Sequence, residues 1–588
     1  MKNEELEKVL AVAEQWTKEP FDADTRAAVK SMIDADDKTE LIDSFYRTLE
    51  FGTGGLRGIM GPGTNRVNQY VVAQATQGYA NYLLKVQEEG GFETLKGDTV
   101  SVVVGHDCRN NGRLFAETVA KVFAANGIKV YLFESLRPTP EISFAIRHLG
   151  CQSGIILTAS HNPKEYNGYK AYWNDGAQII APHDVNIIAE VEKIKGPEEI
   201  KFEARPELIQ IIGEDVDSVY LEKVKTLFLS PESIARNKDL KIVYTPIHGT
   251  GIKLIPRCLK DMGFDNVIIV EEQAVISGDF PTVVSPNPEE PAALDMAIRK
   301  AKEVDADIVM ASDPDADRMG IAVKDDKGEW ILVNGNQTCM MFTYYILRRR
   351  HELGLLKGKE FMVKTIVTTE IMKDICNYYN TPLLDCYTGF KWIAAEIRER
   401  EGKEQYIGGG EESYGYLPAD FLRDKDAVAA CALMAEMTAW AKDNGMSIFE
   451  LIQEVYLQFG YGKEKGISVV RKGKSGAEEI QQMMKDFRAN PPKEIAGSKV
   501  VLIKDYQTLV ARNVVTGEES KLAFPTTSNV LQYFTEDGTK VSVRPSGTEP
   551  KIKFYIEVRG KMTSRADFAR CELEATAKVD AVRASLGV

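Results

Sequence analysis

Asp313, Asp315 and Asp317 alternate with other residues in the segment DPDADR. In an extended loop, alternate residues project to one side, so the three carboxylates should lie together. Like charges this close need a cation, and a loop with few oxygen ligands and room for another suits Mg²⁺. An EF-hand does not fit, because its loop needs glycine sixth and glutamate twelfth, where Arg318 and Lys324 stand here. The alternative is a solvated acidic turn, which the apolar segment ADIVMAS before the loop disfavours.

The segment TASHNPKEYNGYK at residues 158–170 follows the apolar run GIIL and contains a serine. A serine hydroxyl is a poor nucleophile unless a base, a metal or a helix N-terminus assists it. A phosphoserine at Ser160 would supply a further oxygen to a metal held by the aspartates. His161 and Asn162 would then hydrogen-bond the phosphoryl group, and Lys170 is a candidate proton shuttle or charge clamp. The alternative is a surface loop, in which Ser, Asn and Pro are common.

The segment RPSGTEP has the composition of a phosphate-binding turn. Arg544 offers a planar fork to a phosphate, and the hydroxyls of Ser546 and Thr548, with the backbone N–H groups around Gly547, would complete an anion site. An ordinary turn capped by Ser546 is the alternative.

The segment GGGEESYGY offers a carboxylate at Glu411 and a hydroxyl at Ser413. Both groups suit vicinal sugar hydroxyls, and the preceding glycines permit close approach of the backbone to a ligand. A plain glycine-rich turn fits the residues equally well. Together the four segments offer a phosphoryl carrier, a cation site, a hydroxyl-binding site and a phosphate anchor, which predicts phosphoryl transfer on a sugar phosphate.

The segments that position these loops alternate between β-branched runs and helical patterns, which is typical of parallel sheets joined by crossover helices. We expect three such α/β units, the third opening with the strand EWILVNG, and each leading from an apolar strand into a polar loop. Ligands of such sheets bind outside the carboxyl ends of the strands. From about Tyr461 onward the strands shorten and an α+β pattern begins. The predicted domains are residues 1–208 with the serine loop, 209–326 with the metal loop, 327–456 with the sugar loop and 457–588 with the phosphate loop.

Composition excludes several classes of partner. The 588 residues include 73 basic and 87 acidic side chains, a net charge of −14 without a basic cluster, so we expect no nucleic-acid or membrane partner. The longest apolar stretch, from Ala427, meets Glu436 well short of the roughly 20 residues of a membrane span. The acidic N-terminal segment has apolar residues at helical spacing, so we expect neither a signal peptide nor a transit peptide there. Eight scattered cysteines without a C-x-x-C pair indicate reduced thiols, which predicts a cytoplasmic protein.

In this order and at these separations, the four segments resemble those of the α-D-phosphohexomutase superfamily, specifically its phosphoglucomutase/phosphomannomutase group. The similarity covers nearly the whole chain, including FGTGGLRG near the start. The length of the chain and its motif GEESYGY resemble the longer phosphoglucomutase branch of the family. The resemblance implies a four-domain α/β architecture around a central cleft. Its first three domains would share one topology, and a smaller α+β C-terminal domain would be mobile.

The resemblance also implies roles for individual residues. Ser160 would be carried as phosphoserine, with its phosphoryl oxygen joining Asp313, Asp315 and Asp317 on Mg²⁺. Arg57 and Lys170 would lie near the transfer site. The implied substrate-binding residues are Glu411 and Ser413 for sugar hydroxyls, Thr388, Gly389 and Lys391 of TGFKW for sugar orientation, the basic pair Arg423 and Lys425, and Arg544, Ser546, Gly547 and Thr548 for the non-reacting phosphate. Some members carry a histidine after the sugar-binding serine, where Tyr414 and Tyr416 stand here, so no general base is assigned.

The implied activity is interconversion of glucose 1-phosphate and glucose 6-phosphate by a monomer or homodimer, with glucose 1,6-bisphosphate as intermediate and activator. Phosphomannomutase, phosphopentomutase, sugar-bisphosphate synthase and phosphatase activities on the same scaffold remain open. A catalytically silent sugar-phosphate sensor is the alternative outside enzymes. It predicts a damaged serine or aspartate set, yet Ser160 and all three aspartates are present.

Overall fold

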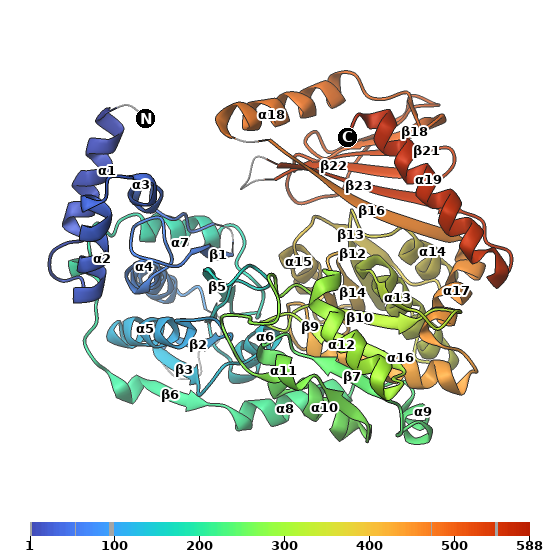
Figure 1. Ribbon diagram of the computed structural model, residues 1–588, viewed down its shortest axis with the longest axis horizontal. Helices are drawn as coiled ribbons and strands as arrows, with labels where there is room; N and C mark the ends of the chain where they lie inside the picture. Colours follow the sequence, from blue (N-terminus) through green and yellow to red (C-terminus); the bar gives the residue numbers. More distant parts are fainter. Residues whose placement is uncertain (1–2, 53, 93–98, 472, 547–550) are drawn as a thin grey trace. The chain divides into compact units, whose positions relative to one another are not determined.

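The computed structural model describes residues 3–52, 54–92, 99–471, 473–546 and 551–588 (Figure 1). The chain divides into two compact units. The first unit comprises Met1–Asn334, Ala394–Gly408 and Ser413–Asp443, and the second comprises Gly335–Ile393, Gly409–Glu412 and Asn444–Val588. Helix α15 (Phe390–Arg400) and strand β14 (Gln405–Gly410) contain residues of both units.

The first unit opens with three helices, α1 (Asn3–Gln15), α2 (Ala23–Asp34) and α3 (Thr39–Phe45). They bury an apolar cluster of their own that includes Val9, Trp16 and Leu41. Helix α2 begins where Asp22 accepts a hydrogen bond from the backbone N–H of Thr25, which satisfies one of the unpaired donors of the first helical turn.

The first sheet has the strand order β1-β5-β4-β2-β3-β6. Its strands are β1 (Gly55–Ile59), β2 (Ser101–His106), β3 (Lys129–Phe133), β4 (Ser153–Leu157), β5 (Tyr166–Trp173) and β6 (Ile209–Ile212). The helices α4 (Gln69–Glu88), α5 (Gly112–Ala125), α6 (Thr139–Leu149) and α7 (His183–Val191) accompany it. Strands β2, β3, β4 and β6 are parallel, whereas β5 runs antiparallel to both β4 and β1.

The expectation of parallel sheets holds for β2, β3, β4 and β6 but not for β5. The loop between β4 and β5 holds only eight residues, 158–165, and a parallel connection needs a crossover of about a dozen or more. That short loop contains Ser160, so the hairpin itself presents the serine.

The second sheet has the strand order β11-β10-β9-β7-β8. Its strands are β7 (Ile242–Thr245), β8 (Val267–Ile269), β9 (Ile308–Ser312), β10 (Met319–Lys324) and β11 (Trp330–Val333), and nearby helices are α8 (Glu214–Lys225), α9 (Pro231–Arg236), α10 (Ile255–Met262), α11 (Glu271–Ala274) and α12 (Pro291–Val304). The segment EWILVNG does not open the third α/β unit as expected, because β11 pairs antiparallel with β10 in this sheet. The cause is the tight turn after β10, where the N–H of Asp325 donates to the carbonyl of Glu329.

Helix α16 (Ala427–Asp443) is the apolar stretch noted in the sequence, and it is buried along most of its length in the first unit. Its Glu436 is fully buried, and Oε1 accepts the N–H groups of Leu229 at 2.8 Å and Ser230 at 2.6 Å. Among the helices that the structure describes, none combines the length and apolarity needed to cross a membrane. No disulfide joins any of the eight cysteines, all of which the structure describes, and seven of them are buried.

The second unit begins with helix α13 (Gly335–Glu352) and the parallel pair β12 (Glu360–Thr365) and β13 (Leu383–Cys386). Helices α14 (Ile371–Tyr378) and α17 (Ile448–Phe459) belong to the same unit. The C-terminal part is an antiparallel sheet in the order β16-β23-β22-β21-β18-β19-β20, with β17 paired to β18. Its elements are β16 (Tyr461–Val470), α18 (Gly473–Ala489), β17 (Glu494–Ile495), β18 (Ser498–Asp505), β19 (Val510–Asn513), β20 (Glu519–Lys521), β21 (Leu531–Thr535), β22 (Lys540–Pro545), β23 (Lys551–Gly560) and α19 (Phe568–Leu586).

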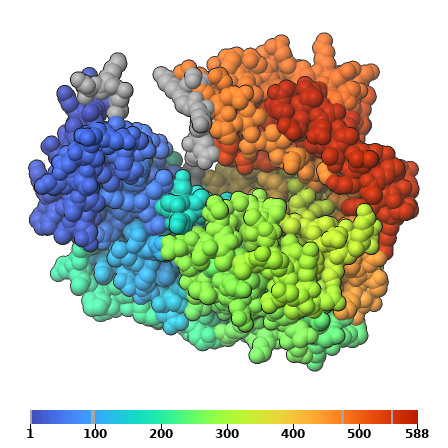
Figure 2. Space-filling view, viewed as in Figure 1, coloured from blue at the N-terminus to red at the C-terminus, as the bar shows by residue number. Residues whose placement is uncertain are grey.

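Helix α19 contacts β16 and β23 through one face. Cys571, Ala575, Val579 and Val582 are buried, and their spacing of three or four residues places them on one stripe of the helix. The opposite face is exposed and forms the red surface in Figure 2. The α+β pattern expected from Tyr461 onward is confirmed, and so is the α/β class of the preceding chain.

Candidate functional site

The aspartate segment follows β9 directly in the first unit. Asp313, Asp315 and Asp317 are buried, and one carboxylate oxygen from each lies within 4.8 Å of the others. Asp313 Oδ1 accepts the N–H groups of Asp317 at 3.1 Å and Arg318 at 3.0 Å, and Ala316 adopts a positive φ of 49°. The loop is therefore a tight turn around its first carboxylate rather than the extended segment expected, and all three side chains still converge.

Ser160 lies beside this cluster. Its Oγ donates to Asp313 Oδ2 at 3.0 Å and lies 3.1 Å from His161 Nδ1. The backbone N–H of Ser160 donates to Thr158 Oγ1 at 2.8 Å, and the residue adopts a left-handed φ of 53°. The serine is 3% exposed, so its hydroxyl is held inside the site rather than displayed on a surface loop.

Two lysines neutralise the carboxylates. Lys170 of β5 donates to Asp315 Oδ2 at 2.7 Å and Asp317 Oδ2 at 3.1 Å. Lys425 Nζ lies 3.2 Å from Asp317 Oδ2 and 3.1 Å from Asp424 Oδ1. The side chain of Lys425 also crosses Gly415, where a Cβ atom would lie 2.1 Å from Lys425 Cδ. Any larger residue at position 415 would therefore clash with the Lys425 side chain that extends to Asp317.

The aspartates fit a divalent cation. Asp315 Oδ1 and Asp317 Oδ1 are buried and have no hydrogen-bond partner among the described residues. Buried carboxylate oxygens without donors are costly unless a cation binds them. Three hard oxygen donors beside a serine hydroxyl match the preference of Mg²⁺, which binds few protein carboxylates and completes its shell with other oxygens.

The site perturbs the ionisation of its own groups. Burial, together with the charges of Asp315 and Asp317, raises the pKa of Asp313 well above its usual value. Burial also opposes ionisation of Asp315 and Asp317, but Lys170 outweighs it and the pKa values of both are lowered. Burial, Arg318 and Arg57 lower the pKa of His161 to about 2, so this imidazole is neutral beside the serine.

Arg57 lies on β1, opposite Gly168 of β5, and its Nη1 donates to Asn162 Oδ1 at 3.3 Å. The strand pairing therefore brings Arg57 to the serine loop. Gly168 makes the pairing possible, because a Cβ atom there would lie 2.6 Å from the carbonyl oxygen of Thr158 and 2.8 Å from that of Leu56.

The basic pair of FLRDKDA separates in the structure. Lys425 reaches the aspartates, whereas Arg423 is 2% exposed and places Nη2 3.1 Å from Glu401 Oε1. The backbone N–H of Arg423 donates to Ser143 Oγ of helix α6 at 2.8 Å. These contacts give Arg423 a structural environment that its sequence motif did not indicate.

Further residues of the site were missed by sequence reasoning. Thr139 Oγ1 donates to Asp315 Oδ2 at 2.7 Å, and the N–H of Thr139 donates to the carbonyl of Asp315 at 2.8 Å. Arg109 binds the carbonyls of the serine loop. Both residues follow strands of the first sheet, β3 and β2, so the rule that ligands bind near strand ends was the one signal pointing to them.

The second unit holds the sugar-loop residue Glu411. It is 7% exposed, and its Oε1 accepts the N–H of Gly389 at 2.8 Å. Gly389 has a φ of 106°, which glycine adopts readily, and it follows Thr388 in the predicted TGFKW loop. Two of the predicted substrate loops therefore meet in this unit, and Lys391 Nζ lies 5.6 Å from the centre of the Trp392 ring. Ser413 is half-buried and belongs to the first unit.

Arg544 is on β22, opposite Lys553 of β23, and the N–H of Ser546 donates to the carbonyl of Lys551 at 2.7 Å. Burial raises the pKa of Tyr555 to about 12, with Glu412 adding to the shift and Arg544 opposing it. Arg544 therefore lies near Tyr555. Gly547 and Thr548 lie outside the described residues.

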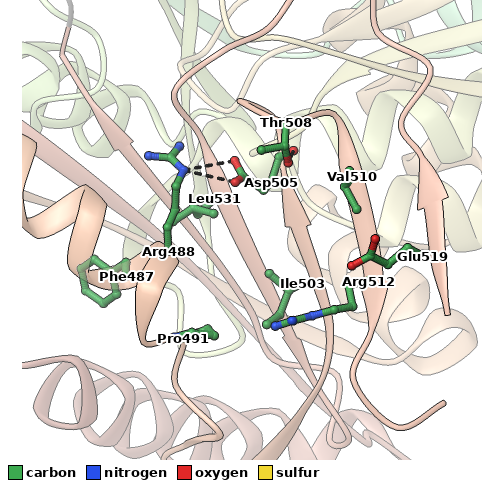
Figure 3. A pocket seen from close by; sticks show the side chains of 10 residues that line it. All are labelled: Phe487, Arg488, Pro491, Ile503, Asp505, Thr508, Val510, Arg512, Glu519 and Leu531. Carbon is green, nitrogen blue, oxygen red and sulfur yellow. Dashed lines mark hydrogen bonds and ion pairs between the residues drawn. The ribbon is translucent and has the colours of Figure 1, made fainter. Parts of the chain in front are cut away.

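A separate pocket lies in the C-terminal part of the second unit (Figure 3). Arg488 points across it to the carboxylate of Asp505, with Nε 3.2 Å from Oδ2, and Arg488 Nη2 donates to Asn529 at 2.6 Å. Of the predicted site residues that the structure describes, none lines this pocket.

A buried serine hydroxyl beside three clustered carboxylates, on an α/β scaffold, is an arrangement that fits a divalent cation next to a hydroxyl group. Models of the phosphoglucomutase/phosphomannomutase family match the chain in order. Their α/β/α domains I, II and III match residues 48–198, 218–328 and 334–459, and their C-terminal domain matches 474–567. The chain belongs to the phosphoglucomutase/phosphomannomutase family, with three α/β domains and a C-terminal domain.

Individual relatives support the same family assignment. A phosphoglucomutase of Staphylococcus haemolyticus is 35% identical over 535 residues, which covers 90% of this chain and 94% of that protein. Two solved structures share the fold at 20% identity. The Paramecium phosphoprotein parafusin, a phosphoglucomutase, has a TM-score of 0.65 over 91% of this chain and 96% of its own. A phosphoglucomutase/phosphomannomutase family protein of Burkholderia thailandensis has a TM-score of 0.62 over 91% and 97%.

Proposed function

We propose that this enzyme is a phosphoglucomutase, which interconverts glucose 1-phosphate and glucose 6-phosphate through a phosphoserine and a glucose 1,6-bisphosphate intermediate. One observation carries the proposal: Ser160 Oγ lies 3.0 Å from a carboxylate of the three-aspartate cluster. The 35% identity to a phosphoglucomutase over 90% of the chain supports the choice of activity.

In the proposed cycle the phosphoryl group moves between Ser160 and the sugar. The bond between Ser160 Oγ and phosphorus breaks, a bond to the free sugar hydroxyl forms, and the proton of that hydroxyl passes to Ser160 Oγ. The bisphosphate then reverses its orientation in the site, and Ser160 takes back the other phosphoryl group. Bound Mg²⁺, held by the three aspartates, would supply electrostatic neutralisation of the phosphoryl charge.

The residues around Ser160 would orient the phosphoryl group during its transfer. Lys170 and Lys425 balance the charge of the aspartates. Arg57 and Asn162, which already hydrogen-bond to each other, would donate to phosphoryl oxygens, and the neutral His161 offers one more hydrogen bond without adding charge. Hydrogen bonds from preorganised donors of this kind become stronger as charge develops on the phosphoryl oxygens in the transition state.

The predicted sugar and phosphate loops would bind the rest of the substrate. We assign Glu411 and Ser413 to the sugar hydroxyls, and Thr388, Gly389 and Lys391 to the sugar orientation. Arg544 and Ser546, together with Gly547 and Thr548, would hold the phosphate that is not being transferred. An anchor that accepts either phosphate allows the sugar to bind in both orientations, which the cycle requires.

Replacing the carrier tests the proposal. Ser160→Ala should abolish mutase turnover and the gain of one phosphate in the intact mass after incubation with glucose 1,6-bisphosphate, while the melting temperature stays near that of the native protein. Ser218→Ala on helix α8, whose hydroxyl donates to Glu214 and accepts from Arg257 and contacts none of the aspartates, is the matched control and should remain active. Near-normal turnover by Ser160→Ala would refute the phosphoserine cycle.

A comparison of substrates tests which sugar phosphate the enzyme prefers. A coupled assay with glucose, mannose and ribose 1-phosphates, with and without the corresponding 1,6- or 1,5-bisphosphate, should give the highest kcat/KM with glucose 1-phosphate. Preference for mannose or ribose 1-phosphate would instead assign a phosphomannomutase or a phosphopentomutase, and net release of inorganic phosphate would assign a phosphatase. We further propose a cytoplasmic monomer or homodimer, which light scattering distinguishes.

A further inference from the structure

Arg109 is a buried cation that binds the backbone of the serine loop. Its Nη1 donates to the carbonyls of Pro163 and Tyr166, both at 2.8 Å, and its Nη2 donates to those of Ser160 at 2.7 Å and Asn162 at 2.5 Å. One guanidinium therefore satisfies four carbonyls in a stretch of seven residues. Because Arg109 is 3% exposed and all of these donors are engaged, it does not serve as a surface anion receptor.

The guanidinium is itself held in place. Asp107 Oδ2 lies 3.4 Å from Arg109 Nε, and Asp107 Oδ1 accepts the N–H of Arg109 at 2.8 Å. The ring of Phe280 stacks on the guanidinium, with 5.2 Å from its centre to Cζ. Asp107 also accepts from Thr158 Oγ1 at 2.6 Å, and Thr158 Oγ1 in turn accepts the N–H of Ser160. The Asp107–Arg109 pair thus contacts both the N–H side and the carbonyl side of Ser160.

This support matters because the conformation of Ser160 is unfavourable. A non-glycine residue with φ near +53° is strained by about 1–3 kcal/mol, and such geometry persists only where surrounding contacts enforce it. The same geometry turns the Ser160 carbonyl towards Arg109 and directs Oγ to Asp313. Four inward carbonyls without donors would carry the penalty of unsatisfied buried acceptors.

We propose that Arg109 is a positioning residue that keeps Ser160 in its left-handed conformation and so aims the hydroxyl, and the phosphoryl group it would carry, at the aspartate cluster. The inference rests on the proposed phosphoserine cycle. Arginine suits the task because its planar fork offers several fixed donors, whereas lysine offers a single mobile ammonium that does not reproduce this pattern.

The test compares two conservative variants. Arg109→Lys keeps the charge but loses the fork, and it should lower kcat by about 10- to 100-fold, the scale of an ångström-size misplacement, while KM changes less than about twofold. The rate at which glucose 1,6-bisphosphate phosphorylates Ser160, followed by intact mass, should fall by the same factor as kcat. The matched control is Arg66→Lys, because Arg66 is also buried and donates to a backbone carbonyl, that of Asp43, but lies outside the serine loop.

A purely structural role gives a different result. It would lower the melting temperature of Arg109→Lys while leaving kcat per folded molecule and the rate of Ser160 phosphorylation at native values, and that outcome would overturn the proposal. If Arg109→Lys does not fold, Asp107→Asn serves instead, because it removes the charge that holds Arg109 while keeping the side-chain volume. A native kcat for folded Asp107→Asn would equally overturn the proposal.

The two proposals fail separately. Turnover by Ser160→Ala would refute the phosphoserine cycle whatever Arg109 does. An inactive Ser160→Ala combined with a fully active Arg109→Lys would refute the positioning role alone.

Discussion

Ser160 Oγ donates to Asp313 Oδ2 at 3.0 Å, although 153 positions of the sequence separate the two residues. Other hydrogen bonds join the same two regions, among them those from Thr139 to Asp315 and from Lys170 to Asp315 and Asp317. The contact is therefore one member of a network that joins the first sheet to the loop after β9, and the network sets the relation between hydroxyl and carboxylates.

Removal of the metal should remove activity. Chelation with EDTA should abolish turnover, and Mg²⁺ should restore it, because the buried carboxylates have oxygens without donors that a cation would satisfy. Asp315→Asn should weaken Mg²⁺ binding, measured by calorimetry, by at least about tenfold, since a charged ligand is lost. Asp295→Asn on the exposed part of α12 is the control and should bind Mg²⁺ normally. Indifference of turnover to EDTA would rule out the metal assignment.

Arg544 is expected to act on binding. Arg544→Ala should raise KM by about tenfold or more, because charge-assisted hydrogen bonds to phosphate contribute roughly 1.5–3 kcal/mol each. Steady-state kinetics measure the effect, and Arg512→Ala, on an exposed residue of β19 in the same sheet, is the control. An unchanged KM for Arg544→Ala would place the phosphate elsewhere.

Arg423 and Lys425 should respond differently to replacement. Arg423→Ala should reduce the free energy of unfolding by about 1–3 kcal/mol, because it leaves the carbonyls of Asp420 and Leu422 without their buried donor. Loss of the ion pair with Glu401 adds little, because 46% of the Glu401 side chain is exposed and Arg147 also pairs with it. Lys425→Ala should instead reduce turnover at saturating substrate, since Lys425 contacts Asp317. Denaturant unfolding and kinetics of both variants check the contrast, and equal losses of activity would contradict it.

Glu370 should make the second unit sensitive to acid. Its Oε1 lies 2.8 Å from Lys540 Nζ and 3.1 Å from Lys364 Nζ, two buried lysines. Burial opposes its ionisation, but the two lysines prevail and lower its pKa far below the ordinary 4.5. A carboxyl with a lowered pKa contributes stability above its unfolded pKa, and this contribution is lost as the pH falls through the folded value.

The measurement is unfolding in denaturant between pH 7 and pH 3. The native protein should lose stability over this range, and Glu370→Gln should be less stable at pH 7 and depend less on pH below 4.5. Glu399→Gln, which replaces an exposed glutamate of α15, is the control and should keep the native pH dependence. If the stability of Glu370→Gln changes with pH in parallel with that of the native protein, the two lysines do not lower the pKa of Glu370 in the folded state.

Much of the site could be predicted from the sequence because its chemistry is local. The alternation of Asp313, Asp315 and Asp317 predicted their convergence, and the apolar run before Ser160 predicted a strand opening into a polar loop. The alternation of strand and helix patterns predicted the α/β class. These features depend on residue types within a few positions of each other, so hydrophobic periodicity and side-chain chemistry are sufficient to predict them.

Tertiary structure decided the rest, because hydrogen-bond partners and side-chain directions depend on segments distant in sequence. The reversal of β5 and the pairing of β11 with β10 follow from connections too short for a crossover. Arg423 and Lys425, two residues apart, go to Glu401 and Asp317 because the surrounding loop is irregular rather than extended. Arg109 had no recognisable motif, since its partners are backbone carbonyls, and only the folded loop brings four of them to one guanidinium.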